Sequence, residues 1–177
     1  MQLMDVIKET EFLSREFLVW IWYKSETNGG MHKLTDDREV ELWVDRKIVL
    51  RYDDENGSEK ITCTGDNPHL KEAKFGLFEN KQVTESKLKL LIDDNEYSFT
   101  LDASWMNLKS FKTPKVMQDK DDDPEGIFYE KIYLIDQALS TLDTIYGQFV
   151  NLRLSQEWKD SELPAIIDWI RQVRKKH

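Results

Sequence analysis

The chain has 177 residues, a length typical of one domain, and its hydrophobic fraction of 40% is enough to form a core and excludes a disordered chain. Its 25 basic and 34 acidic residues give a net charge of −9, which disfavours strong nonspecific binding to a polyanion. One cysteine excludes an intrachain disulfide, and the sequence shows neither a signal peptide nor an apolar run of about 20 residues, so we expect a cytoplasmic protein outside the membrane.

The first part of the chain predicts a helix followed by a β-meander. Apolar residues at helical spacing, uninterrupted by proline or glycine, predict a helix over residues 5–26, and Asn28-Gly29-Gly30 is a stop signal. Alternation of apolar and polar residues then predicts three strands, over 39–44, 47–52 and 59–64. Asp45 and Arg46 separate the first two strands by the length of a tight hairpin turn.

The next part predicts the same order again. Pro68 lies near the first turn of a short helix over residues 68–80. Three more alternating segments predict strands over 87–92, 96–101 and 105–111. The second meander therefore ends just before Thr113-Pro114.

The strongest periodic signal follows an acidic linker over residues 118–125. Seven apolar residues step by four and three in strict alternation: Phe128, Ile132, Ile135, Leu139, Leu142, Tyr146 and Phe149. This pattern predicts a helix over 124–154, about 45 Å long, which either packs along the sheet or pairs with its own copy in a dimer. A last helix is predicted over 156–176, where Pro164 either kinks it or starts a new helix at Leu163.

These elements predict one α+β domain over residues 1–177, with two antiparallel β-meanders, each preceded by a helix, then the heptad-patterned helix and a terminal helix. Strands grouped in meanders, rather than alternating with helices, favour antiparallel pairing. The repeated order suggests two halves, 5–64 and 68–111, followed by a helical part, 124–176, although no residue-level repeat supports them.

No motif for catalysis, metal binding or a cofactor is present, so we expect no catalytic residue, no metal and no cofactor. The histidines His32, His69 and His177 are not spaced as zinc ligands with Cys63, and we expect them at the surface and the cysteine in the core. Gly29-Gly30 is not followed by the residues of a phosphate-binding loop. The acidic run 119–123 lacks the spacing of a calcium loop and is interpreted as a solvated linker.

The first helix holds one candidate binding face. It is apolar nearly all round, which is typical of a core helix or of an interface, and its Arg15 or Glu16 would then need a partner. Either the helix is central to the core, or its aromatic residues anchor a protein partner. The residues of this candidate face are Arg15, Glu16, Trp20, Trp22 and Tyr23.

Two basic segments are candidates for contacts with nucleic acid. They comprise Lys109, Lys112 and Lys115, and Arg171, Arg174 and Lys175. Both could touch phosphates, although the second set also lies where a helix dipole favours positive charge.

Four segments resemble members of the RdgC-like recombination-associated family. They are FLSREFLVWIWYKSE at 12–26, SFTLD at 98–102, PKVMQD at 114–119 and DPEGIFYEK at 123–131. The resemblance covers most of the chain and carries over no catalytic or binding role for any position. It implies a DNA-recombination setting, in which RdgC itself is a DNA-binding dimer that restrains the strand-exchange recombinase. The acidic charge departs from a DNA clamp and fits a companion that binds another protein.

Three functions are therefore open. The first is a non-enzymatic interaction protein, an accessory of DNA recombination that binds a protein partner and forms a homodimer through the heptad helix. The second is direct DNA binding through the two basic segments. The third is an enzyme with dispersed acidic residues, which would require a cleft where carboxylates converge.

Overall fold

Antiparallel strand pairing organises the chain, which is described here from a computed structural model over residues 3–35, 37–65, 70–116 and 123–173. Within these ranges six strands form one sheet, in the order β1-β2-β4-β5-β6, and β3 pairs with β2. The strands are β1 (Met31–Thr35), β2 (Arg38–Asp54), β3 (Gly57–Thr64), β4 (Gln82–Ile92), β5 (Asn95–Asp102) and β6 (Asn107–Lys112). The predicted α+β class and antiparallel pairing are confirmed.

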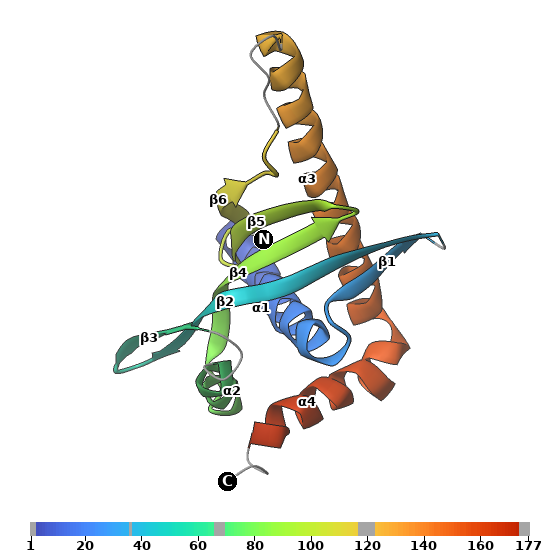
Figure 1. Ribbon diagram of the computed structural model, residues 1–177. Coiled ribbons are helices and arrows are strands. Elements are labelled where there is room, and N and C mark those ends of the chain that lie inside the picture. Colours follow the sequence, from blue (N-terminus) through green and yellow to red (C-terminus); the bar gives the residue numbers. More distant parts are fainter. Residues whose placement is uncertain (1–2, 36, 66–69, 117–122, 174–177) are drawn as a thin grey trace.

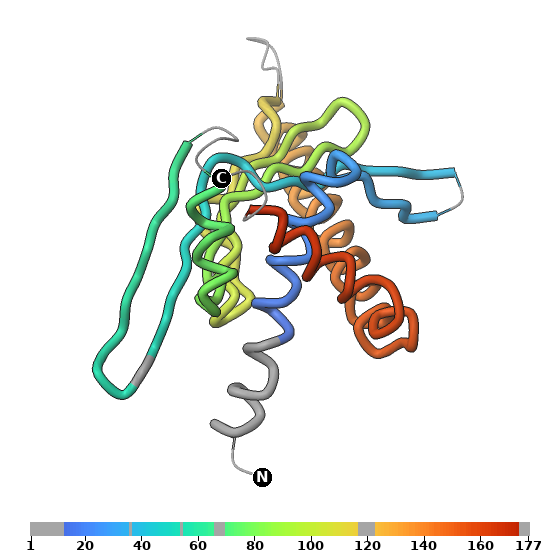
Figure 2. The backbone as a smooth tube through the Cα atoms, turned by 90° about the horizontal axis from the view of Figure 1, so that it is seen from below, coloured from blue at the N-terminus to red at the C-terminus, as the bar shows by residue number. Residues whose placement is uncertain are grey.

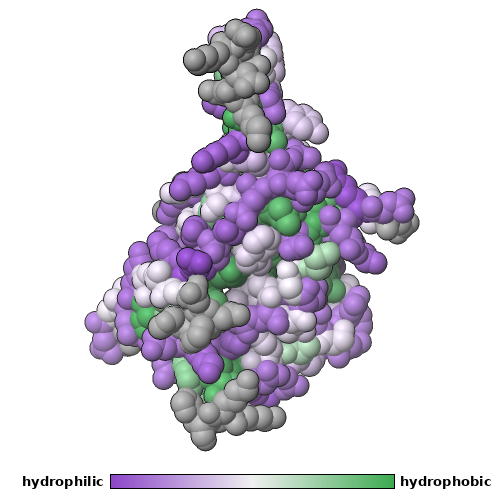
Figure 3. Space-filling view, in the orientation of Figure 1, coloured by the Kyte–Doolittle hydropathy of each residue, from purple (hydrophilic) through white to green (hydrophobic). Residues whose placement is uncertain are grey.

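Helices cover one face of this sheet. They are α1 (Leu3–Thr27), α2 (Leu70–Phe78), α3 (Pro124–Leu154) and α4 (Leu163–Arg171), with the π-helical turn η2 (Trp158–Glu162) before α4. Figures 1 and 2 show α1 and α3 on the same side of the sheet. On that side, Leu90 of β4 and Phe99 of β5 are buried. Apart from Val49, which is buried, the other face carries mostly half-buried or exposed residues, and Figure 3 shows it to be mainly hydrophilic.

The hairpin predicted at Asp45-Arg46 is wrong, because β2 is one strand of 17 residues. The pairing of β2 with β4 shifts register between Val44 and Ile48, and Arg46 has a φ of 60°. These residues therefore form an irregularity that bends the strand instead of reversing it. The Asp45 carboxylate lies 2.7 Å from Lys87 Nζ on β4, which holds the irregularity against the neighbouring strand.

Pairing between β2 and β4 joins the two predicted halves in one sheet. The register runs from Glu41 opposite Leu91 to Arg51 opposite Gln82. Strand β1 was not predicted, because five residues with little alternation leave no strong pattern. It pairs with the first part of β2, and β3 pairs with the last part.

Each of the two C-terminal helices, α3 and α4, has a proline near its first residue. Helix α3 has the predicted bounds, and the Asp123 side chain caps it by accepting a hydrogen bond from the Glu125 N–H at 3.2 Å. Helix α4 begins at Leu163 beside Pro164 but is not a separate new helix: Glu162 and Leu163 both have right-handed helical backbone angles, so α4 continues η2 directly, with the π-helical turn just before Pro164. No helix in the described ranges has both the length and the apolar character that crossing a membrane requires.

Gly30 is the tightest point of the turn between α1 and β1. Its φ is +75°, and an added Cβ would lie 2.4 Å from the Leu42 carbonyl oxygen. Gly29 has a φ of +70° with no atom within 4 Å of such a Cβ. We expect Gly29→Ala to lose about 1 kcal/mol of unfolding free energy through backbone strain alone, and Gly30→Ala about 2 kcal/mol more. Urea denaturation of both variants measures this difference, and equal losses would contradict the close approach.

Candidate protein-interaction surface

Helix α3 is held by the body of the protein along only part of its length. Its buried residues lie on one side: Leu134, Ala138, Thr141, Ile145 and Phe149. Figure 1 shows the N-terminal turns of α3, at the top of the view, extending past the sheet. The C-terminal half is therefore anchored in the core. In the N-terminal half, residues 124–139, only Leu134 and Ala138 are buried and the turns before Leu134 project from the body, so we call it the projecting half.

The predicted heptad row is split between these two halves. In the anchored half, Phe17 of α1 packs against Tyr146 and Phe149, with ring centroids 5.1 and 5.3 Å apart. In the projecting half the row continues as four exposed side chains, which we call the apolar stripe: Phe128 (59% exposed), Ile132 (46%), Ile135 (39%) and Leu139 (45%). The core uses one end of the row and leaves the other in solvent.

The apolar stripe forms one continuous strip on the helix surface. Residues three and four apart lie on the same face of a helix, so its four members follow one another along the axis. Tyr129, 61% exposed, adds a further aromatic ring beside Phe128, with ring centroids 6.0 Å apart. Single exposed apolar residues are common on proteins, but a row of large ones marks an interaction site.

A small apolar pocket lies at the base of the stripe. It has a volume of about 190 Å³ and opens between α3, α1 and the β5–β6 edge. Its walls include Leu139, Leu142 and Tyr146 from α3, with Phe17 and Met106 opposite. The stripe therefore leads directly into a hollow of the same character.

The aromatic residues of α1 belong to the core. Trp20 is 5% exposed and packs 5.4 Å from Phe149, and Trp22 is 1% exposed and packs edge-on against Trp169, with ring centroids 5.2 Å apart. Tyr23 is half-buried against the same Trp169. Of the two alternatives drawn from the sequence, this is the arrangement of a central helix.

The charged residues of the predicted α1 face have partners in the same chain. The Glu16 carboxylate accepts a hydrogen bond from Arg153 Nε of α3 at 2.6 Å. Glu16 therefore has the partner that a charged residue in an apolar helix needs. Arg15 donates a hydrogen bond to the Gln82 side chain. These contacts tie α1 to the long helix and to β4.

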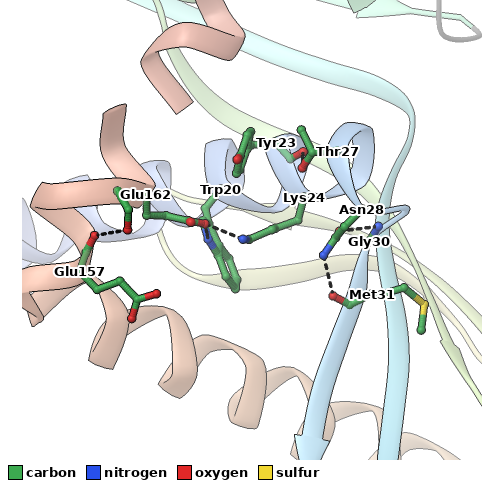
Figure 4. Close-up of polar contacts among 10 residues, drawn as sticks. Trp20, Tyr23, Lys24, Thr27, Asn28, Gly30, Met31, Glu157 and Glu162 are labelled. Carbon is green, nitrogen blue, oxygen red and sulfur yellow. Dashed lines mark hydrogen bonds and ion pairs between the residues drawn. The ribbon is translucent and has the colours of Figure 1, made fainter. Parts of the chain in front are cut away.

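Glu162 ties the C-terminal segment to α1 in the same way. Its carboxylate accepts a hydrogen bond from Trp20 Nε1 at 2.8 Å and lies 2.6 Å from Lys24 Nζ (Figure 4). An acidic residue shared by a buried indole and a partly buried amine positions η2 against α1. The candidate residues of α1 thus make their contacts within the chain, and these contacts hold α1 against the anchored half of α3 and the segment after it.

The first basic set lies at an edge of the sheet. The Nζ atom of Lys109 on β6 lies 2.5 Å from Asp102 Oδ2. The hydrogen bond that Lys109 donates to this carboxylate raises the pKa of Lys109. Lys112 ends β6 and Lys115 follows it, and both are exposed. One of the three predicted phosphate contacts is therefore already paired within the sheet.

The second basic set lies elsewhere. Arg171 is exposed at the end of α4, whereas Arg174 and Lys175 fall outside the described residues. Figure 1 shows β6 and the end of α4 well apart. Lys109, Lys112 and Arg171 consequently do not form one basic surface.

The expectation of surface histidines is wrong for His32, which is 5% exposed. Burial, with a smaller contribution from Lys24, lowers the pKa of His32 to about 4. His69 and His177 lie outside the described residues. Cys63 is buried as predicted, and burial raises the pKa of its thiol, which disfavours a reactive thiolate. Within the described ranges, no three histidine, cysteine or acidic side chains gather as metal ligands.

The sequence-based candidate residues did not include the apolar stripe. The sequence pattern that contains the stripe is the heptad row, whose seven members look equivalent. In the structure only the last three of them pack under α1 or in the core. Comparisons of the chain with family models, curated proteins and solved structures found no match. The geometry of the surface is therefore the basis for the proposal that follows.

Proposed function

We propose that the chain is a non-enzymatic interaction protein that binds another protein chain through the projecting half of α3. The observation that carries this proposal is the exposed apolar stripe on a helix whose other half is locked in the core. Amphipathic helices bind partners through residues at this spacing. The rigid anchor reduces the conformational entropy lost on binding, because the helix is already formed.

The cellular setting proposed is DNA recombination, which rests on the resemblance to the RdgC-like family. A net charge of −9 favours contact with a protein over wrapping of DNA. The projecting helix begins with the acidic residues Asp123 and Glu125, which a DNA backbone would repel. The chain would then act as a companion subunit, not as the DNA clamp.

A matched pair of charge insertions tests the stripe. Ile132→Glu places a carboxylate in the stripe, whereas Tyr133→Glu places one at the neighbouring position, where the tyrosine is 64% exposed and points to another side of the helix. We expect Ile132→Glu to reduce capture of protein partners from host lysate at least about tenfold, because a charge in an apolar interface is left unpaired. Tyr133→Glu should retain capture. The measurement is mass spectrometry after tagged affinity capture with nuclease present, from a host that also expresses the chain with a second, different tag, so that a second copy is scored as a partner.

Equal capture by the two variants would contradict a role for the stripe. Direct DNA binding is the second candidate, favoured only by the exposed Lys112, Lys115 and Arg171. It predicts that all partners vanish with nuclease, and that Lys112→Glu or Arg171→Glu weakens binding of a DNA duplex in low salt. In that case neither Ile132→Glu nor Tyr133→Glu would change the affinity for DNA.

A further inference from the structure

We propose that the apolar stripe binds a second copy of this chain, with the two projecting half-helices packed side by side and antiparallel. This inference rests on the proposed function and names its partner. Four residues spaced four, three and four apart fit the interlocking of a two-helix coiled coil. The same strip on both copies is self-complementary under two-fold symmetry.

The packing of α1 decides the orientation. Phe17 of α1 already covers Tyr146 and Phe149, which continue the row beyond the stripe. In a parallel pair the helix of the second copy would run on towards this position and meet α1. In an antiparallel pair the two bodies lie at opposite ends of the paired segment, as the projection of α3 in Figure 1 allows.

The antiparallel register also fills the pocket at the base of the stripe. Ile132 of each copy faces Ile135 of the other, and this alignment sets Phe128 opposite Leu139. Leu139 forms part of the wall of the 190 Å³ pocket. A cavity of about 150 Å³ accepts a benzene ring, so the Phe128 ring of the second copy fits here. Symmetry repeats this contact at both ends of the pair, giving two buried aromatic anchors.

Charge alone would favour the opposite orientation. A parallel pair places Lys131 of one copy beside Asp136 of the other, whereas an antiparallel pair places each beside its own equivalent. All of these side chains are exposed, and such pairs contribute only about 0–1 kcal/mol. Burial of an aromatic ring contributes about 1.5–3 kcal/mol and there are two of them, so apolar packing decides.

The contact area predicts a reversible dimer. The four stripe residues and Tyr129 are each roughly half exposed, so pairing them buries on the order of 1,000 Å² in total. That value is near the lower limit for a specific interface of about 1,000 Å². We therefore expect dimers that dissociate on dilution.

Disulfide trapping tests both the partner and the orientation. In a Cys63→Ala background, two single-cysteine chains, Phe128→Cys and Leu139→Cys, are oxidised separately and as a mixture at high concentration. The antiparallel register predicts that the mixture cross-links at least about tenfold faster than either chain alone, because a disulfide needs Cα atoms within about 7 Å. Each mixed pair keeps one of the two Phe128–Leu139 contacts. Leu154→Cys, at a position 78% exposed at the far end of α3, is the control and should not cross-link.

The remaining outcomes show which of the claims fails: the orientation, the second copy as partner, or the proposed function. Fast cross-linking of Phe128→Cys with itself would overturn the antiparallel orientation. Absence of any cross-link, together with a monomer mass in sedimentation of the wild-type chain at high concentration, would overturn the second copy as the partner. The proposed function would still stand if Ile132→Glu abolished capture of a different protein. If that variant also changed no capture, both proposals would fall.

Discussion

Replacing Phe149 with alanine is expected to lower the free energy of unfolding by about 3–5 kcal/mol. The Phe149 side chain is fully buried, and its ring centroid lies 5.3 Å from that of Phe17, 5.4 Å from that of Trp20 and 5.8 Å from that of Trp158. It therefore joins α1, α3 and the π-helical turn at one point. Its removal leaves a cavity that three large rings cannot all move to fill.

Phe128 on the same helix supplies the matched control. It is 59% exposed, so Phe128→Ala should cost less than about 1 kcal/mol at concentrations where the chain is a monomer. Guanidinium denaturation followed by far-UV circular dichroism measures both losses. Similar losses for the two variants would mean that α3 is not anchored at its C-terminal half.

Acid should destabilise the protein through His32. The pKa of this buried imidazole is lowered from 6.5 to about 4, first by burial and then by Lys24, so the folded chain resists a proton that the unfolded chain accepts. Stability linked to this residue is full above pH 6.5 and is lost as the pH falls from 6.5 towards 4. We expect a loss of about 2 kcal/mol between pH 7 and pH 5.

A variant without the imidazole isolates this contribution. His32→Gln removes the titrating group, so its stability should fall less steeply than that of the wild type between pH 7 and pH 5. The difference between the two slopes cancels the carboxylates, which titrate in both proteins. Parallel curves from denaturant unfolding at several pH values would show that His32 takes up its proton in the folded state without cost.

Local signals predicted α3 well and β2 poorly. A proline, an acidic cap and a long apolar period mark the start and extent of α3 without reference to the rest of the fold. Asp45 and Arg46 have the composition of a turn, but pairing of β2 with β4 on both sides of them keeps the strand going. Long-range pairing of this kind overrides local turn preference, and no pattern in the sequence announces it.

The candidate surface shows the same limit. Heptad spacing identified the apolar row, but the sequence does not show where the row leaves the core and enters solvent. That boundary depends on where α1 crosses α3, at Phe17 and Tyr146. Conversely, the tryptophans of α1 have the composition of an interface, yet Trp20 and Trp22 are buried by contacts with segments more than a hundred residues away.

Hydroxyl-radical footprinting of the unmodified chain tests most directly whether the projecting half of α3 binds a protein. Reactivity at Phe128 and Tyr129 is compared between the dilute purified chain and the chain in nuclease-treated host lysate. Tyr52, 40% exposed on the β2–β3 hairpin, which lies away from α3 in Figure 1, is the reference. We predict that Phe128 and Tyr129 become protected in the lysate while Tyr52 keeps its reactivity. Unchanged reactivity at Phe128 and Tyr129 would contradict the claim that a partner covers the apolar stripe.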